Sequence, residues 1–403
     1  MTNRQPSVGI VTFTFGVNFG CHLQRYALQV ACERLGYQAQ AILLSHGDLV
    51  KPSRPGTIKR ARYTLRRFRE KARQKSYYDL LFGAQRRRKK AFDAFEKKFL
   101  NTTKRFYSYA SIKASYESLG FDAYVAGSDQ IWNPLGMGVP DCYNYFMLDF
   151  VPSDKKIAYA PSVAVSKLAD KYVERFQRYL SDFRFLSARE IEGARELERI
   201  LGREVPVVVD PTGLLTSDAW DVLADQAKPL AAEKYVLCYS LSNLEAILRH
   251  AKKVQKALDC PIVCFEEDRK SDRLAKELAG DGAVVVKNAG PCEFVNYIKH
   301  AECVITDSFH GAIFPIVYRR PFYAMTRDRA NQEESMNSRI FTLLSILKLE
   351  DRLFEPDDER SIGVNDVQID YRDVETRLRE CADFSLTYLK NALAAVTGQN
   401  NES

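Results

Sequence analysis

The sequence predicts an α/β protein that is built from two open parallel sheets, one after the other along the chain. Its 403 residues, of which 46% are hydrophobic, suffice for two domains with separate cores. Short apolar runs alternate with amphipathic helical stretches from residue 8 onward, and this alternation favours parallel sheets. A basic segment interrupts the alternation at residues 51–105, and a second, more regular series begins near residue 184.

The first series opens with a βαβ pattern. Residues 8–15 form a short apolar run, and a second apolar run follows at 39–44. Between them, Leu23, Ala27 and Leu35 recur at helical spacing until Gly36 ends the helix. The loop after the first strand lacks GxGxxG, so the dinucleotide-binding fingerprint is absent. Further strands are predicted at 121–126 and 156–161.

The second series repeats strand and helix more regularly. Strands are predicted at 184–187, 205–210, 235–241, 261–266, 283–287, 303–306 and 321–325, with a helix at 244–258 among them. We therefore expect an N-terminal domain at 1–185, which includes the basic insertion, and a C-terminal domain at 186–365. A final helix with a frayed polar tail is predicted at 366–403.

The positive charge is concentrated in the segment 51–105. This segment holds 20 Lys or Arg and four acidic residues, whereas the rest of the chain holds 39 basic and 48 acidic residues. Apolar side chains at helical spacing predict two basic amphipathic helices, one near 57–74 and one that contains Ala91, Phe92, Phe95 and Phe99. Such helices suit an anionic lipid surface or an anionic substrate, and a solvated helical insertion is the alternative. No nucleic-acid motif accompanies the charge, so we expect no nucleic-acid partner.

The composition excludes several other classes of protein. No run of 18 apolar residues is present, and the N-terminal apolar stretch is too short for a secretory signal, so a cytosolic protein is expected. The nine cysteines are scattered and include no CxxC pair, so they are expected to be reduced. His250, Cys260 and Cys264 lack the spacing of a zinc module, and no metal is predicted.

Polar loops that follow predicted strands are the candidate sites, because ligands of open parallel sheets bind at the carboxyl ends of strands. The most unusual is DSFHG, at 307–311, between a strand and a helix that Pro315 places near Ala312. The backbone N–H groups of Ser308 to Gly311 are then expected to form an anion pocket, with His310 at its rim. Gly311 would let a ligand approach the backbone. Alternatively, Asp307 or Ser308 caps the helix and His310 packs against the neighbouring strand.

Three further loops carry charged side chains. Asp129 follows the strand 121–126 in GSDQIWNP, either as a functional carboxylate or as a turn residue, and Trp132 beside it could wall a sugar-sized pocket or belong to the core. Arg189 follows the strand 184–187, where its guanidinium suits a carboxylate or phosphate, or a surface ion pair. The long polar loop 326–339 could place Arg327 or Arg339 on an anion, or remain solvated.

Four of these stretches together resemble the polysaccharide pyruvyl transferase family. They are TDSFHGAIFPI, AGSDQIWNP, the SARE turn with VVVDPTGLL, and the opening FGVNFGCHLQRYALQ. The resemblance runs from about residue 8 to about residue 350, and the basic helices are its least characteristic part. It implies an α/β fold of two Rossmann-like domains that face a cleft, similar to the GT-B glycosyltransferases, with the basic helices as an insertion in the N-terminal domain.

The resemblance also implies an activity. A pyruvyl group would move from phosphoenolpyruvate to two hydroxyls of a sugar, which forms a cyclic ketal and releases phosphate. By motif, the catalytic residues would be His310 and Asp129, although the GSD turn replaces the glycine-only turn of some members. The other implied residues are, on the donor side, Arg189, Ser308, Phe309, Gly311 and Arg339, and on the acceptor side, Asn18, Gln24 and Trp132.

The implied chemistry agrees with these residue types. Phosphoenolpyruvate carries a carboxylate and a phosphate, which require cationic and N–H donors at two points. Ketal formation also needs proton transfer, which His310 and Asp129 could provide. The expected partners are phosphoenolpyruvate as co-substrate, a sugar or lipid-linked glycan, and the inner face of an anionic membrane, with no cofactor or metal. The alternatives are a nucleotide-sugar glycosyltransferase and a non-catalytic binding protein of the same fold.

Overall fold

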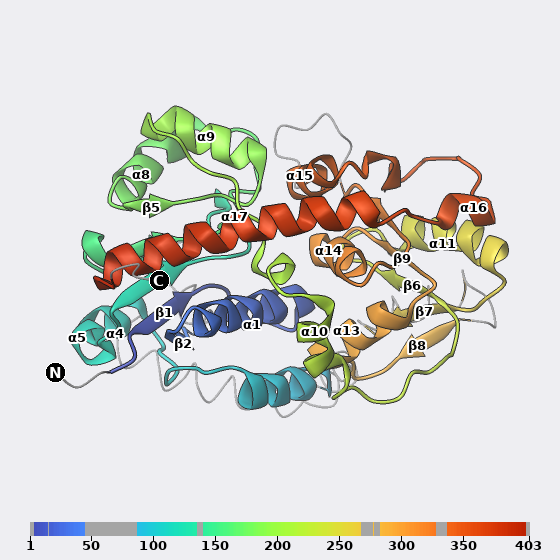
Figure 1. Cartoon of the computed structure of the whole chain (residues 1–403), viewed down its shortest axis with the longest axis horizontal. Coiled ribbons are helices and arrows are strands. Elements are labelled where there is room, and N and C mark those ends of the chain that lie inside the picture. Colours follow the sequence, from blue (N-terminus) through green and yellow to red (C-terminus); the bar gives the residue numbers. More distant parts are fainter. Residues whose placement is uncertain are drawn as a thin grey trace, which may run out of the picture.

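Two parallel sheets form the framework of the chain (Figure 1). The computed structural model describes residues 4–14, 16–44, 87–134, 140–266, 277, 283–327 and 337–399. The predicted helix near 57–74 and most of the loop 326–339 lie outside these residues. Both sheets are covered by helices, so the predicted α/β fold with two Rossmann-like domains is confirmed.

The N-terminal sheet has the strand order β2-β1-β3-β4-β5, and every pair in it is parallel. This is the doubly wound order of flavodoxin-like sheets. Its strands are β1 (Ser7–Val11), β2 (Gln38–Ala41), β3 (Ala123–Ala126), β4 (Lys156–Ala158) and β5 (Phe185–Leu186). Its main helices and turns are α1 (Phe19–Arg34), α4 (Tyr109–Ala114), α5 (Tyr116–Leu119), α7 (Pro140–Phe146), η1 (Ser153–Lys155), α8 (Asp170–Leu180) and α9 (Ile191–Leu201).

The C-terminal sheet has the order β11-β10-β9-β6-β7-β8, again with parallel pairs throughout. If β6 to β11 are numbered 1 to 6 and the sheet is read from β8 to β11, this is the Rossmann order 3-2-1-4-5-6. Its strands are β6 (Val236–Tyr239), β7 (Ile262–Phe265), β8 (Val284–Val286), β9 (Cys303–Thr306), β10 (Phe322–Met325) and β11 (Leu353–Phe354). The accompanying helices are α10 (Ser217–Ala224), α11 (Leu244–Leu258), α13 (Pro291–His300), α14 (Phe309–Val317), α15 (Ser338–Leu347) and α16 (Val364–Val367), with 3-10 turns η2 (Pro211–Gly213) and η4 (Glu350–Arg352).

The boundary between the domains lies later than residue 186. Residues 205–210 form no full strand, but Ala188 pairs with Val207 in an isolated parallel bridge beside β5. Ala194, Leu197 and Ile200 of α9 are buried in the same hydrophobic cluster as the N-terminal strands and helices. The segment that was assigned to the C-terminal domain up to about residue 208 therefore packs with the N-terminal one.

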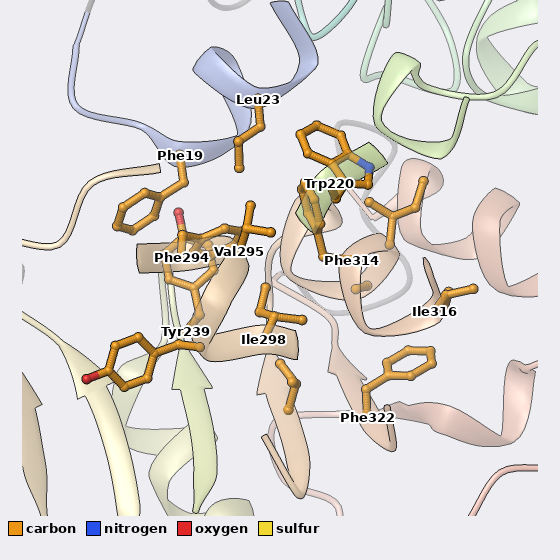
Figure 2. Packing of buried hydrophobic residues seen from close by; sticks show 14 of the residues in the cluster. Phe19, Leu23, Trp220, Tyr239, Phe294, Val295, Ile298, Phe314, Ile316 and Phe322 are labelled. Atoms are coloured by element: carbon orange, nitrogen blue, oxygen red, sulfur yellow. The ribbon is translucent and has the colours of Figure 1, made fainter. Parts of the chain in front are cut away.

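A shared apolar core joins the two domains. Phe19 and Leu23 of α1 lie in one cluster with Phe294 of α13, Trp220 of α10 and Phe314 of α14 (Figure 2). The rings of Phe19 and Phe294 stack with centroids 4.6 Å apart and an interplanar angle of 16°. Fully buried aromatic rings contribute much of the apolar area that holds a core together. The contact between the domains is therefore a packed interior.

The C-terminal helix α17 (Arg372–Thr397) also connects the domains. Its first turns pack on the shared core through Val374 and Leu378, and its last turns bury Leu389 and Leu393 against the strands of the N-terminal sheet. Figure 1 shows this red helix running across both halves of the molecule. The predicted final helix is confirmed, and it returns the chain to the N-terminal domain.

The second basic helix is present at residues 87–99, but its apolar face is not available to a lipid surface. Phe92 and Phe95 are 1% and 3% exposed and belong to the shared core. Arg88 is also buried, with its guanidinium 5.2 Å from the centroid of Phe19. The exposed side of the helix carries Lys89, 65% exposed, and Lys97. Among the described helices, none is long and apolar enough to cross a membrane.

Candidate active site

The candidate site lies where each sheet changes the direction of its strand order. These switch points fall between β1 and β3 in the N-terminal sheet and between β6 and β9 in the C-terminal sheet. Ligands of doubly wound sheets bind in the crevice at such points, outside the carboxyl ends of the strands. The loop after β3 carries Asp129, the loop after β1 leads into α1, and α14 with His310 follows β9. The structure brings these three segments together.

The turn after β9 differs from the predicted one. The helix α14 begins at Phe309, three residues before the predicted start, and Ser308 caps it by accepting from the Gly311 N–H at 3.3 Å. Pro315 is accommodated inside this buried helix, in place of the first turn. The Ser308 N–H donates to Thr306 Oγ1 at 3.0 Å, so two of the N–H groups that were expected to face an anion bond to the protein.

The glycine and the aspartate of this motif have structural partners. A Cβ atom on Gly311 would lie 2.2 Å from Thr306 Oγ1, so the close approach at this glycine is that of the preceding strand and not of a ligand. The carboxylate of Asp307 accepts from the backbone N–H groups of Leu241 (2.6 Å) and Ser242 (2.9 Å). Asp307 thereby ties the ends of β9 and β6 together at the switch point.

His310 is buried between the two domains. Its Nε2 lies 3.7 Å from Asp210 Oδ1, and its ring meets the ring of Phe309 edge to face at 5.3 Å. No hydrogen-bond partner within the described residues satisfies Nε2. Buried polar atoms are almost always hydrogen-bonded, so an unsatisfied one in a candidate site is suited to a ligand.

Arg189 lies on the N-terminal side of the same site. Its side chain is 1% exposed, and Nη1 donates to Asp210 Oδ2 at 2.7 Å. Its guanidinium carbon lies 4.6 Å from the centroid of the Phe309 ring. Its Nε and Nη2 atoms have no hydrogen-bond partner among the described residues, although Asp129 Oδ1 lies 3.8 Å from Nη2. The alternative of a surface ion pair is therefore wrong, because the ion pair of Arg189 is buried and its partner is Asp210.

Asp129 sits opposite Arg189 in a strained turn. Its φ is 70°, a left-handed conformation that costs a non-glycine residue about 1–3 kcal/mol and is held by surrounding contacts. Cys21 Sγ donates to Oδ2 at 3.0 Å, and the Gln130 N–H donates to Oδ1 at 2.8 Å. Burial alone would raise the pKa of Asp129, but Arg189 and His310 outweigh burial and hold this pKa below its ordinary value. The carboxylate is therefore ionised at neutral pH.

Asp210 joins these groups, and the sequence had not identified it as a site residue. It lies in VVVDPTGLL, is fully buried, and accepts from Ser128 Oγ at 2.9 Å in addition to Arg189. Its other oxygen accepts from the Thr212 N–H and Oγ1. Burial would raise the pKa of Asp210, but the His310 ring and Arg189 hold this pKa well below its ordinary value. The available signal was a lone carboxylate at the end of an apolar run.

Arg339 adds a second buried guanidinium, from the start of α15. Burial, followed by repulsion from Arg189 and Arg327, lowers the pKa of Arg339 to about 9. The Gln130 side chain, with its amide oxygen turned toward Arg339, accepts from Nη1 at 2.8 Å. Arg327 is itself held by a bond from Nε to the Asp307 carbonyl at 2.8 Å. Positive charges gathered in this way favour an anionic ligand.

A pocket of 240 Å³ adjoins these arginines. Arg189, Asp210, Phe309 and Arg339 form one side of it, and apolar residues of α15 and α17 form much of the rest. The described residues, those of the candidate site included, hold no group of three or more His, Cys, Asp or Glu side chains that could bind a metal ion. None of the nine cysteines, all of which lie in the described part of the chain, forms a disulfide.

The three residues expected on the acceptor side take structural roles here. Trp132 is fully buried, and its Nε1 donates to the Phe146 carbonyl at 3.2 Å, so the indole belongs to the core. Gln24 is also fully buried and donates to Thr12 Oγ1 at 2.9 Å, while its Oε1 accepts from the Ser128 N–H at 3.2 Å. Asn18 caps α1 by accepting from the Cys21 N–H at 3.1 Å. Gln24 and Asn18 thus shape the loops beside Asp129.

Comparison with solved structures returns nucleotide-sugar enzymes at low similarity. A putative UDP-N-acetylglucosamine 2-epimerase from Listeria monocytogenes matches with a TM-score of 0.49 and 12% identity, over 99% of this chain and 92% of that one. The S. aureus MnaA-UDP structure matches with a TM-score of 0.48 and 14% identity, over 96% and 91%. The E. coli heptosyltransferase WaaC with ADP gives 0.41 and 11%, over 93% and 99%. At these scores, the description of the fold rests on the chain's own two sheets.

Comparison with curated proteins finds no match. The family model for polysaccharide pyruvyl transferase matches residues 18–329, which include the motifs that carry Asp129, Arg189, Asp210 and His310. The match therefore covers most of the chain and the candidate site except Arg339, which lies beyond residue 329. The chain belongs to the polysaccharide pyruvyl transferase family.

Proposed function

We propose that this enzyme transfers a pyruvyl group from phosphoenolpyruvate to two hydroxyls of a sugar in a cell-surface glycan or its precursor. The product is a cyclic ketal, and phosphate is released. The observation that carries the proposal is the buried cluster of Arg189, His310 and Asp129 around Asp210, at the facing switch points of the two sheets. Family membership supports pyruvyl transfer to a polysaccharide.

The donor is inferred from the two buried guanidiniums of the site. Phosphoenolpyruvate presents a carboxylate and a phosphate on a three-carbon frame, and the guanidinium of Arg189 lies close enough to Arg339 to help lower the pKa of Arg339. Arg189 offers Nε and Nη2, which find no protein partner among the described residues. Charge-assisted bonds to an anion would satisfy these donors, and planar guanidiniums match carboxylate and phosphate geometry.

The reaction needs two new carbon–oxygen bonds and one broken one. One sugar hydroxyl adds to C2 of phosphoenolpyruvate while C3 gains a proton and becomes a methyl group. The bond between C2 and the phosphate oxygen then breaks, phosphate leaves, and the second hydroxyl oxygen bonds to C2. The two hydroxyl protons lost balance the proton gained at C3 and the one that leaves with phosphate or solvent.

In the proposal, the side chains divide this work. Asp129 accepts a hydroxyl proton, for which its low pKa keeps it in the ionised form. His310 delivers the proton to C3 or stabilises the departing phosphate, and a positioned acid or base of this kind contributes roughly 10²- to 10⁴-fold. Arg189 and Arg339 hold the donor, and Asp210 holds Arg189 and faces His310. Every step is assigned to side chains of this chain, with phosphoenolpyruvate as the co-substrate.

The location in the cell is also a proposal. We infer that the enzyme works in the cytoplasm, where phosphoenolpyruvate is available, and that basic side chains such as Lys89 and Lys97 bring it to an anionic membrane that carries lipid-linked acceptor. The apolar face of the helix 87–99 is buried in the protein, so this helix would contact the membrane through its charged side chains and not by insertion.

A transfer assay tests the activity. The protein is incubated with phosphoenolpyruvate labelled with ¹³C at C2 and with a pool of sugars, nucleotide sugars and lipid-linked glycans. We expect a new ketal carbon signal and an equal amount of inorganic phosphate, both absent with His310→Ala. Transfer of a sugar from a nucleotide donor to the same pool, without use of phosphoenolpyruvate, would instead identify a glycosyltransferase.

A further inference from the structure

Gly20 lies directly against the ring of His310. A Cβ atom built on Gly20 would be 2.0 Å from His310 Nδ1, 2.4 Å from Cγ and 2.6 Å from Cε1. Contacts below 3.0 Å are essentially never seen for Cβ atoms, so no other residue fits without displacing the ring. Gly20 is the second residue of α1 and its φ is not positive, so the helix itself does not require glycine there. Glycine is required there because the His310 ring occupies the space of a side chain.

The ring cannot easily move aside. On one side it meets Gly20 of the N-terminal domain, and its Nε2 lies 3.7 Å from Asp210 Oδ1. Its own chain neighbour Phe309 packs edge to face against it and is covered by the Arg189 guanidinium. Packed interiors transmit such strain, because side chains there have few alternative positions.

The helix that carries Gly20 is equally fixed. Phe19, the residue before Gly20, stacks on Phe294 of the C-terminal domain. The centroid of its ring also lies 5.2 Å from that of the Phe92 ring. Figure 2 shows Phe19 and Leu23 of α1 facing Phe294 and Val295 of α13. The clash between a larger residue at position 20 and His310 therefore cannot be relieved by moving α1 away from α14 without opening the shared core.

We propose that Gly20 is a positioning residue for His310. By leaving the space of a side chain empty, it lets the C-terminal domain bring the histidine into the site that Asp129 and Arg189 form in the N-terminal domain. The next residue of the same helical turn, Cys21, donates to Asp129 at 3.0 Å. The first turn of α1 thus contacts both candidate catalytic groups. The part of this inference that concerns catalysis rests on the proposed function.

A double-mutant cycle tests the contact. Gly20→Ala, His310→Ala and the double variant are compared with wild type by thermal unfolding. In the wild-type background, Gly20→Ala is expected to lower the midpoint. In the His310→Ala background it is expected to raise the midpoint or leave it unchanged, because the ring is gone and alanine is the better helix former. Equal losses in both backgrounds would overturn the proposal.

A matched control uses another crowded helical glycine. A Cβ atom on Gly193 of α9 would lie 3.0 Å from Glu190 Oε1, and the three atoms nearest to it all belong to Glu190. Gly193→Ala is expected to change the midpoint by the same amount with and without His310. A reversal of sign at Gly193 as well would show that His310→Ala loosens the whole fold, which contradicts a specific contact.

A second readout separates positioning from general stability. The chain has five histidines, so the ring signals of His310 in a histidine-labelled NMR spectrum are identified by their loss in His310→Ala. Gly20→Ala is expected to shift these signals and to leave those of His250, which stacks on Phe354, in place. Unmoved His310 signals would refute the inference.

The proposed function adds a third readout. Turnover in Gly20→Ala is expected to fall as far as in His310→Ala, with no further loss in the double variant, while phosphoenolpyruvate still raises the unfolding midpoint through Arg189. If no acceptor supports turnover but the sign reversal and the NMR shifts are found, the positioning contact stands and the proposed function fails. Wild-type turnover in Gly20→Ala would refute the positioning role itself.

Discussion

Replacing Asp210 with asparagine should destabilise the protein and loosen its site. The carboxylate accepts from Arg189 Nη1 and Ser128 Oγ on one oxygen, and from the Thr212 N–H and Oγ1 on the other. Asparagine keeps the shape, but its NH₂ group would face two of these donors whichever way the amide is turned. The substitution also removes the charge that partners a fully buried guanidinium.

The expected loss is about 3 kcal/mol. Breaking a buried ion pair by removing one partner costs about 3–5 kcal/mol, because the other charge is left uncompensated. Asp129 and Glu190 lie 3.8 Å and 3.9 Å from the same guanidinium and compensate it in part, so we expect the lower end of that range.

The loss should depend on pH. The folded-state pKa of Asp210 lies below its ordinary value, so the carboxylate contributes stability above the pKa of the unfolded chain, about 3.9. This contribution is lost as the pH falls toward the folded-state pKa. The difference between wild type and Asp210→Asn should therefore be largest near neutral pH and should narrow below about pH 4.

Urea unfolding followed by the fluorescence of the two tryptophans measures this difference at several pH values. Asp383→Asn on the exposed side of α17 is the matched control, and we expect it to change stability by no more than about 0.5 kcal/mol. An Asp210→Asn protein as stable as this control, or a loss that does not change with pH, would refute the reasoning.

Three further predictions concern single groups. Cys21→Ala removes the thiol that donates to Asp129, so the pKa of Asp129 should rise. The acid limb of the pH–activity profile should then move to higher pH. Cys21→Ser keeps a donor and should leave the profile unchanged. Arg339→Met removes a buried cation whose pKa is lowered to about 9 by burial and by neighbouring arginines. The thermal unfolding midpoint at neutral pH should therefore stay the same or rise. The increase in this midpoint that phosphoenolpyruvate causes should become smaller. Reversing the exposed Lys89, Lys90 and Lys97 to glutamate should abolish sedimentation with anionic vesicles at low salt; sedimentation equal to that of wild type would contradict charge-driven contact of this helix.

Apolar runs predicted the framework well, and for a physical reason. Strands of a parallel sheet are covered on both faces, so β6 and β9 consist of buried residues throughout and are visible as continuous apolar stretches. The run 205–210 is also rich in valine but makes only an isolated bridge through Val207. Composition cannot tell whether a partner strand lies beside a run.

Individual site residues were predicted to different degrees. His310, Asp129 and Arg189 were identified because charged groups at strand ends converge in this class of sheet, and the structure brings them together. Asp210 was missed because its importance depends on Arg189 and Ser128, which lie far from it in the sequence. Trp132 was expected to line a pocket, but tertiary packing places it in the core.

The helix after β9 shows how one local rule can be overridden. Pro315 suggested a start near Ala312, because proline is best tolerated in a first turn. The structure begins the helix at Phe309, where Ser308 provides the cap. The serine three residues before Gly311 was the better signal for the helix start.

The apolar face of the helix 87–99 illustrates a limit of periodicity. The spacing of Phe92 and Phe95 correctly indicated an amphipathic helix, but it could not indicate what the apolar side contacts. The structure places both rings in the core that joins the two domains. A membrane and a protein interior impose the same spacing on a helix.

The most direct test of the central claim is thermal unfolding with and without millimolar phosphoenolpyruvate, with a nucleoside diphosphate as the control ligand. A ligand at about 100 times its dissociation constant stabilises by about 2.7 kcal/mol, which moves the midpoint by a few degrees. Arg189→Lys keeps a positive charge beside Asp210 but loses the fork that matches an anion, and Arg195→Lys on the exposed side of α9 is its control. We expect phosphoenolpyruvate, and not the nucleotide, to raise the unfolding midpoint of wild type and of Arg195→Lys, and we expect this rise to be lost in Arg189→Lys. A shift by the nucleotide alone, or an undiminished phosphoenolpyruvate shift in Arg189→Lys, would contradict this expectation.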